Sequence, residues 1–292
     1  MELDDLRAFV RVAETGSVSL AARDLNITQS AVTRRVQRLE TNLGTALLDR
    51  HTRPATLTAR GQAVLERCRR VLNDMREVHA AAGNGDLPRG EVRIGVAHAL
   101  TELTLTGPVG QVRRKFAKIE LRLRTGWSRE LLEHVRTGAL DAAVLLLPQG
   151  EQLPTDVAGR EMGKERLVVV GPRREGLPTR IADLAGVQWI LNPEGCAARA
   201  ALRRALLRAN VDMIVGVEAY NYELQLALAA QSRGLSLVPG RVLARSRLRS
   251  RLRALRIAGL DFPLTIWMVH RHPFTAFDPV IQELSRVLIE RL

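Results

Sequence analysis

The apolar positions of the first 43 residues follow helical spacing in three successive segments. The first segment ends at Gly16, and the second is followed by a turn at Asn26 and Ile27. In the third segment the apolar positions recur at spacings of four, three and four residues. The pattern predicts three short helices around one core, with a helix-turn-helix over about 17–40. The expected core positions are Leu3, Leu6, Phe9, Val10, Ala13, Leu20, Ala21, Leu25, Val32, Val36, Leu39 and Leu43.

The outer face of the third segment is polar and suited to contact DNA. Thr28 is the expected N-cap, with its hydroxyl accepting a backbone hydrogen bond of the helix. Amide, hydroxyl and guanidinium groups are the types that read base edges and hold phosphates. A polar face also occurs on ordinary solvated helices, so this pattern alone leaves both interpretations open. The residues that we expect at a DNA contact are Ser17, Thr28, Gln29, Ser30, Thr33, Arg34, Gln37 and Arg38.

A short turn with two arginines follows these helices. The stretch LLDRHTRPATLT at 47–58 places Arg50 and Arg53 beside Pro54, as a small DNA-contacting β-wing would. Residues 3–62 resemble the N-terminal domain of the LysR-type transcriptional regulators, because LRAFV, ETGSVSLAARDLNITQSAVTRRVQRLE, LGTALLDR and LTARG stand in the family's order. The chain departs from the family's usual residues at Val18, Ser30 and Leu48, which are packing or capping positions. The resemblance implies a winged helix-turn-helix over 1–60 that binds double-stranded operator DNA.

Residues 58–81 are expected to form one long helix, with Thr58 as its N-cap. Apolar side chains recur along it at spacings of four, three, four and three, which is typical of a coiled-coil seam. The alternative is that this stripe packs against its own domain. The resemblance favours self-association, because the family's linker helices pair antiparallel in a dimer, and it implies a tetramer through the effector domains. The expected dimerisation residues are Val64, Cys68, Val71, Met75 and Val78.

A glycine- and proline-rich hinge linker at 82–90 precedes a different pattern. Short apolar or β-branched runs at 91–97, 119–125, 141–147, 166–171, 187–191, 213–218, 235–239 and 264–270 alternate with helical segments, which predicts a mostly parallel sheet covered by helices. The resemblance implies a two-lobed α/β effector domain of the periplasmic-binding-protein type. We expect lobe I to comprise 91–162 and 264–292 and lobe II to comprise 163–263, with hinges near 162 and 264. The whole chain is thus a multidomain α+β protein.

Ligands of open α/β sheets bind beyond the carboxyl ends of the strands. Ser128 is expected to begin a helix, where it could cap the helix or donate to an anionic effector, and the family carries a Ser or Thr at this effector-contacting position. His98 and Trp127 indicate a narrowed or aromatic-preferring cleft. The expected effector-binding residues are His98, Ala99, Leu100, Thr101, Ser128, Pro193, Gly195, Cys196 and Asn221.

Cys196 raises the alternative of a thiol or peroxide sensor, because the peroxide-sensing branch of the family has a reactive cysteine in this loop. A thiolate needs activation by a helix N-terminus or by cations, and Arg199 follows Cys196. The only other cysteine, Cys68, belongs to the long helix, so no resolving thiol accompanies Cys196. We therefore favour binding of a small molecule.

The net charge of +13 adds little to the DNA-binding interpretation. Residues 1–90 hold 14 arginines and 11 acidic residues, and the run at 241–256 holds seven arginines and no acid, so most of the excess lies elsewhere. No apolar run approaches the roughly 18 residues that span a bilayer, and no N-terminal signal is present, so we expect a cytoplasmic protein.

Catalysis finds no support in the sequence. The six histidines show no metal-ligand spacing, and HExxH, GxSxG, Walker and strand-linked GxGxxG motifs are absent, so no enzyme activity, metal or cofactor is expected. The rival interpretation is a solute-binding or enzyme domain with an incidental helical N-terminus. The predicted partners are DNA, a small and possibly anionic effector, and a second copy of the chain.

Overall fold

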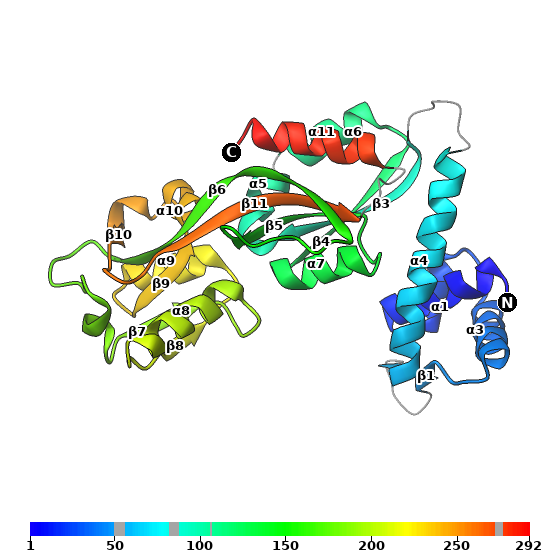
Figure 1. Ribbon diagram of the computed structural model, residues 1–292, viewed down its shortest axis with the longest axis horizontal. Coiled ribbons are helices and arrows are strands. Elements are labelled where there is room, and N and C mark those ends of the chain that lie inside the picture. Colours follow the sequence, from blue (N-terminus) through cyan, green and yellow to red (C-terminus); the bar gives the residue numbers. More distant parts are fainter. Residues whose placement is uncertain (50–55, 82–87, 106, 272–276) are drawn as a thin grey trace.

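The computed structural model describes residues 1–49, 56–81, 88–105, 107–271 and 277–292. Its N-terminal unit contains helices α1 (Leu3–Thr15), α2 (Val18–Asp24) and α3 (Gln29–Leu43), with the short antiparallel strands β1 (Leu48–Asp49) and β2 (Thr56–Leu57) (Figure 1). This arrangement confirms the winged helix-turn-helix. The two predicted wing arginines, Arg50 and Arg53, lie outside the described residues.

Local sequence signals set the ends of these helices. Gly16 adopts φ 63° after α1, a left-handed conformation that glycine enters without steric cost. The Ser17 hydroxyl accepts a hydrogen bond from Leu20 N at 3.3 Å, and the Thr28 hydroxyl accepts one from Ala31 N at 3.2 Å. The Ser17 cap fixes the start of α2, and the Thr28 cap fixes the start of α3 after the turn. The core beneath them includes Leu6, Phe9, Val12, Ala21, Val32, Val36 and Leu39, all buried.

The long helix α4 (Ala59–Ala81) joins the two halves of the chain (Figure 1). Thr58 precedes it as predicted, and its hydroxyl accepts a hydrogen bond from Gly61 N at 2.9 Å. Leu65 and Cys68 are buried in the N-terminal core, and Val64 and Leu72 pack against that core. Cys68 is therefore buried within its own chain and Val64 packs against the same core, so the predicted dimerisation stripe is not open for pairing along its whole length. Val71 and Val78, by contrast, have 43% and 61% of their surface exposed.

The C-terminal half is built on one nine-stranded sheet in the described residues, with the order β4-β3-β5-β11-β6-β9-β7-β8 and with β10 paired to β6. Strands β3, β4 and β5 are mutually parallel, as are β7, β8 and β9. The strands are β3 (Gly90–Ala97), β4 (Ile119–Gly126), β5 (Ala142–Pro148), β6 (Val157–Pro172), β7 (Gln188–Leu191), β8 (Ile214–Glu218), β9 (Leu235–Pro239), β10 (Leu252–Leu255) and β11 (Phe262–Arg271).

Two long antiparallel strands, β6 and β11, lie at the centre of this sheet and extend into both of its halves (Figure 1). Met162 and Ile266 belong to a core with β3 and β5, whereas Leu167 belongs to a second core with β7 and β9. Leu264 packs against both cores. The register of the pair shifts between Ile266 and Trp267, beside Met162. The segments near 162 and 264 thus lie within strands rather than in loops, and we call the two cores lobe I and lobe II.

Helices cover both faces of the lobes. Lobe I carries η1 (His98–Leu100), α5 (Thr101–Leu105), α6 (Pro108–Lys115), α7 (Ser128–Arg136) and α11 (Asp278–Ile289), and lobe II carries η2 (Ile181–Leu184), α8 (Ala197–Arg208), α9 (Tyr222–Ala230), α10 (Gly240–Arg245) and η3 (Arg249–Arg251). None of the helices in the described ranges is both long and apolar enough to cross a bilayer.

The sequence pattern does not indicate strand β10, which lies in the arginine-rich run at 241–256. Leu252 and Leu255 are buried on it, whereas Arg253 between them is exposed. Because these two buried leucines stand among seven exposed or half-exposed arginines, the run has the pattern of a charged surface rather than of a strand. The strand expected at 166–171 is longer than predicted, since β6 already begins at Val157.

Candidate DNA-binding face and ligand cavity

The outer face of α3 is the candidate DNA-binding surface. Ser17 and Thr28 act as helix caps, and the Thr28 hydroxyl also lies 3.0 Å from the Ser30 hydroxyl. The Thr33 hydroxyl donates to the Gln29 carbonyl at 2.9 Å. Seven of the predicted residues are solvent-exposed along one side of the recognition helix: Thr28, Gln29, Ser30, Thr33, Arg34, Gln37 and Arg38.

Arg38 has a structural partner that the sequence did not indicate. Its Nε lies 3.0 Å from both oxygens of Asp5, and its Nη2 donates to Asp5 at 2.6 Å and to Glu2 at 2.9 Å. The Asp5 side chain is fully buried at the start of α1. Burial alone would raise the pKa of the Asp5 carboxyl, but the hydrogen bonds from Arg38 and from Glu2 N–H outweigh it, so the pKa lies below its usual value. Arg38 therefore ties α3 to α1, and its expected role as a DNA contact is weakened.

A cavity of about 420 Å³ lies between the two lobes. Ala97, Gly126 and Pro148 line it at the carboxyl ends of three parallel strands of lobe I, and Pro239 lines it at the end of β9 in lobe II. This is the position where open α/β sheets bind ligands. Most of the wall is apolar, with four alanines of α8 facing Leu146, Phe262 and Leu264. Its size and lining suit a small organic molecule.

The cavity contains five of the nine predicted effector residues, namely His98, Ala99, Ser128, Gly195 and Cys196. The other four predicted residues do not line the cavity. Leu100 is fully buried in the lobe I core, and the Thr101 hydroxyl donates to the His98 carbonyl at 3.0 Å. Asn221 caps α9, since its Oδ1 accepts from Leu224 N at 3.0 Å, and Pro193 does not line the cavity. These residues shape the loops rather than the binding surface.

Ser128 is the first residue of α7, while Trp127 holds the N-cap position without a side-chain cap. Of the two roles considered for Ser128, the helix cap is therefore not the one that the structure shows. Its Oγ accepts a hydrogen bond from Leu146 N at 3.0 Å, across to β5. Because a hydroxyl has one proton to donate, the Ser128 proton remains for a ligand in the cavity.

An aromatic cluster joins the two lobes beside the cavity. The His98 and Trp127 rings of lobe I lie edge to face at 4.7 Å, and Tyr220 of lobe II stacks on Trp127 at 6.0 Å. A Cβ at Gly195, which has φ +90°, would lie 3.3 Å from the Trp127 ring. Burial lowers the pKa of His98, although Glu130 raises it to a smaller extent, so its imidazole is neutral at pH 7. The three aromatic rings and Gly195 thus bring the two lobes close together beside the cavity.

Cys196 ends a buried polar network in lobe II. The Asn192 amide donates to the Cys196 sulfur at 3.6 Å and to the Tyr222 hydroxyl at 3.1 Å. Gln225 donates to Asn192 Oδ1 at 2.6 Å and accepts from the Ser236 hydroxyl at 2.9 Å. Burial raises the pKa of Tyr222, so its hydroxyl stays protonated. The network fixes the loop that carries Cys196 and presents Tyr222 to the cavity.

Several cavity residues were not predicted from the sequence, most clearly Tyr222 and Arg204. Tyr222 stands directly after the predicted Asn221, so a search of the whole loop would have found it. Arg204 is exposed on α8, about two turns beyond the predicted loop, and in the described part of the chain no carboxylate pairs with it. Arg129 also lines the cavity, but it is paired with Glu151 at 3.0 Å.

The recognition helix and the inter-lobe cavity on one chain define a class of protein: a DNA-binding regulator that carries its own ligand-binding domain. Comparison with known families agrees. Residues 3–62 match the bacterial regulatory helix-turn-helix domain of the LysR family, and residues 85–292 match the LysR substrate-binding domain. The chain belongs to the LysR-type family of DNA-binding transcriptional regulators.

Similar proteins support this assignment. The chain is 28% identical over 258 residues to the regulator GltR of Bacillus subtilis, a match that covers 88% of this chain and 86% of that protein. It is 30% identical over 239 residues to the regulator CzcR of Bacillus anthracis, with 82% and 80% covered. A full-length OxyR variant of Pseudomonas aeruginosa shares the fold with a TM-score of 0.76 at 20% identity, covering 99% and 94% of the two chains. CbnR in complex with its target DNA gives a TM-score of 0.59 at 23% identity, with both chains fully covered.

Proposed function

We propose that this regulator binds operator DNA through α3 as a dimer and changes its DNA contact when a small apolar molecule with an anionic head enters the inter-lobe cavity. We further propose that it acts in the cytoplasm, where the promoter DNA is, and catalyses no reaction. The relatives named above are transcriptional regulators, which supports this interpretation over that of an enzyme.

The observation that carries the ligand class is the distribution of donors around the cavity. Ser128 of lobe I and Tyr222 of lobe II each receive a hydrogen bond from an amide, so each hydroxyl has its proton left to give. Arg204 adds a cation at the rim. A ligand that satisfies donors needs acceptor oxygens, and the alanine, leucine and aromatic walls need an apolar body. A small apolar carboxylate meets both requirements.

Two measurements on the full-length chain test the proposal. Selection from random duplex DNA should yield a pseudo-palindromic site, bound in a salt-dependent manner. A thermal-shift screen of small carboxylates should then identify a ligand, because a compound at 100 times its Kd adds roughly 2.7 kcal/mol of stability. Amide or alcohol analogues of the same carbon skeleton serve as controls. Enrichment of no sequence, or equal shifts with carboxylates and their amides, would contradict the proposal.

Ser128→Ala should weaken binding of the best carboxylate from that screen by about 1 kcal/mol or more, because one hydrogen bond to a charged group is removed. Ser128→Thr retains the hydroxyl and is the matched control. Titration calorimetry of both variants measures the difference. Affinity for the selected DNA in the absence of carboxylate should stay at the wild-type value. If Ser128→Ala binds the carboxylate as the wild type does, the head group lies elsewhere in the cavity.

Cys196→Ser should retain both the carboxylate response and the DNA binding. The thiol is buried among Asn192 and Tyr222, and the other cysteine, Cys68, lies in the N-terminal core, where burial raises the pKa of its thiol to about 11. A thiol with such a pKa is a poor resolving partner. A DNA-binding response to hydrogen peroxide that Cys196→Ser abolishes would instead favour the thiol-sensing alternative.

A further inference from the structure

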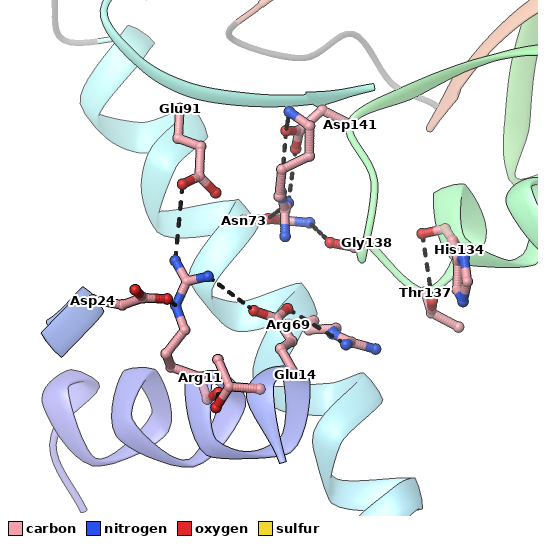
Figure 2. Close-up of polar contacts among 12 residues, drawn as sticks. Arg11, Glu14, Asp24, Arg69, Asn73, Glu91, His134, Thr137, Gly138 and Asp141 are labelled. Carbon is pink, nitrogen blue, oxygen red and sulfur yellow. Dashed lines mark hydrogen bonds and ion pairs between the residues drawn. The ribbon is translucent and has the colours of Figure 1, made fainter. Parts of the chain in front are cut away.

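Helix α7 links the ligand cavity to the helix that carries the DNA-binding domain. Its first residues, Ser128 and Arg129, line the cavity together with the preceding Trp127. Its nine residues span roughly 13 Å at 1.5 Å per residue. The loop that follows, Thr137–Asp141, lies against α4 (Figure 2). One rigid element therefore touches the ligand site at one end and the linker helix at the other.

Asn73 of α4 is the centre of that second contact. Its side-chain amide donates to the Gly138 carbonyl at 3.0 Å (Figure 2). Its Oδ1 accepts from Arg93 at 3.1 Å and from Arg76. Asn73 is 8% exposed. A buried amide that makes bonds on both sides has one orientation, because an unpaired amide would cost free energy.

Charged side chains of lobe I and α4 meet beside Asn73. Asp141 is 7% exposed and accepts from Arg93 N at 2.8 Å and from Arg93 Nη2 at 2.9 Å. Arg76 of α4 approaches the same carboxylate at 3.4 Å. Arg93 and Asp141 both belong to lobe I, so their pair stays formed whether or not α4 is in contact. The charge contact that α4 itself makes is the Arg76–Asp141 ion pair, whose loss would leave Arg76 without this partner.

Gly138 allows the close approach. Its φ is +73°, and a Cβ placed there would overlap the Asn73 amide nitrogen. Two independent constraints therefore favour glycine at this position, namely the left-handed backbone and the neighbouring helix. Gly186 has the first constraint without the second, since its φ is +74° but a Cβ placed there would meet no atom within 4 Å.

We infer that the Asn73–Gly138 contact is a joint through which occupancy of the cavity changes the hold of lobe I on α4, with α7 as the connecting element. The inference rests on the proposed function of the cavity. A group that packs against Trp127 and Ser128 displaces the start of α7, and the hydrogen-bonded helix carries this displacement to Gly138. The Asn73 hydrogen bonds and the Arg76–Asp141 ion pair then have two states, docked and released, whose balance the cavity biases.

Hydrogen–deuterium exchange of the full-length protein tests this joint without DNA or ligand. Asn73→Ala and Gly138→Ala should each raise exchange at α4 amides 69–76 roughly tenfold, as the removal of a buried hydrogen bond implies. Because coupling is reciprocal, both should also raise exchange at the cavity end, at Leu131 N, which bonds to the Trp127 carbonyl, and at Leu146 N, which bonds to Ser128. Gly186→Ala, which strains the backbone alone, should change neither region.

The coupling can also be tested from the cavity end, with a bulky side chain in place of a ligand. Ala201→Phe fills the cavity wall on α8 and should alter exchange at amides 69–76 in the wild-type background but not in Asn73→Ala, where the joint is already released. Exchange that rises only near residue 138, with the cavity end unchanged in Asn73→Ala, would show a merely structural contact and overturn the inference. Failure of the DNA selection or of the carboxylate screen would leave these exchange results unaffected, so the two hypotheses fail separately.

Discussion

Val71→Asp should convert the regulator into a monomer and abolish binding to its selected DNA site. Val71 is 43% exposed and Val78 is 61% exposed, with the half-buried Met75 between them on the side of α4 that the chain leaves open. A symmetric pairing of this stripe would cover all three side chains. The two aspartates of such a pairing would be buried without cations, at a cost on the order of several kcal/mol. Sedimentation velocity measures the dissociation of the dimer.

Arg70→Asp is the matched control for this experiment, because it introduces the same carboxylate on the same turn at an exposed position beside the stripe. It should remain a dimer with the wild-type sedimentation coefficient. DNA binding depends on the dimer, since two recognition helices must reach successive major grooves. If Val71→Asp remains a DNA-binding dimer, the pairing surface lies away from α4.

The outcome along α4 shows what periodicity can and cannot predict. The spacing of apolar residues correctly indicated a helix with a buried stripe, but spacing does not say which neighbour covers the stripe. Leu65 and Cys68 face α1, whereas Val71 and Val78 remain open. The third side, which carries Asn73 and Arg76, meets lobe I through polar groups. Polar contacts between distant segments leave no periodic signal, so the sequence did not indicate this interface.

The cavity shows the same limit of what the sequence can predict about side-chain contacts. Strand ends and loops could be placed from the sequence, and they brought His98, Ser128 and Cys196 to one site. The direction of each side chain within a loop depends on local turns, which is why Thr101 bonds to its own loop and Asn221 caps a helix. Arg204 reaches the cavity from within α8, where a residue's face depends on how the helix packs. Short motifs could not supply that orientation.

Arg34→Ala should reduce specific DNA affinity by about 1–3 kcal/mol per recognition helix and leave thermal stability unchanged. Arg34 is exposed on the outer face of α3, and in the described residues no carboxylate pairs with it. Fluorescence anisotropy with the selected duplex gives the affinity, and repetition at several salt concentrations gives the number of phosphate contacts. If Arg34 binds a phosphate, its removal from both helices of the dimer should lower the slope of log affinity against log salt concentration by about two. If Arg34 reads a base, its removal should instead relax specificity at one position of each half-site.

Arg38→Ala is the paired variant, because it lies one helical turn further on the same face and carries the same side chain. Its guanidinium is held by Asp5 and Glu2, so removal should leave the buried Asp5 carboxylate unpaired and lower the melting temperature of the protein. Its DNA affinity, measured on the folded protein at low temperature, should fall less than that of Arg34→Ala. The opposite order, with a stable Arg38→Ala that fails to bind DNA and an Arg34→Ala that binds normally, would mean that Arg38 leaves Asp5 for the DNA backbone and that the reading edge of α3 lies one turn closer to its C-terminus.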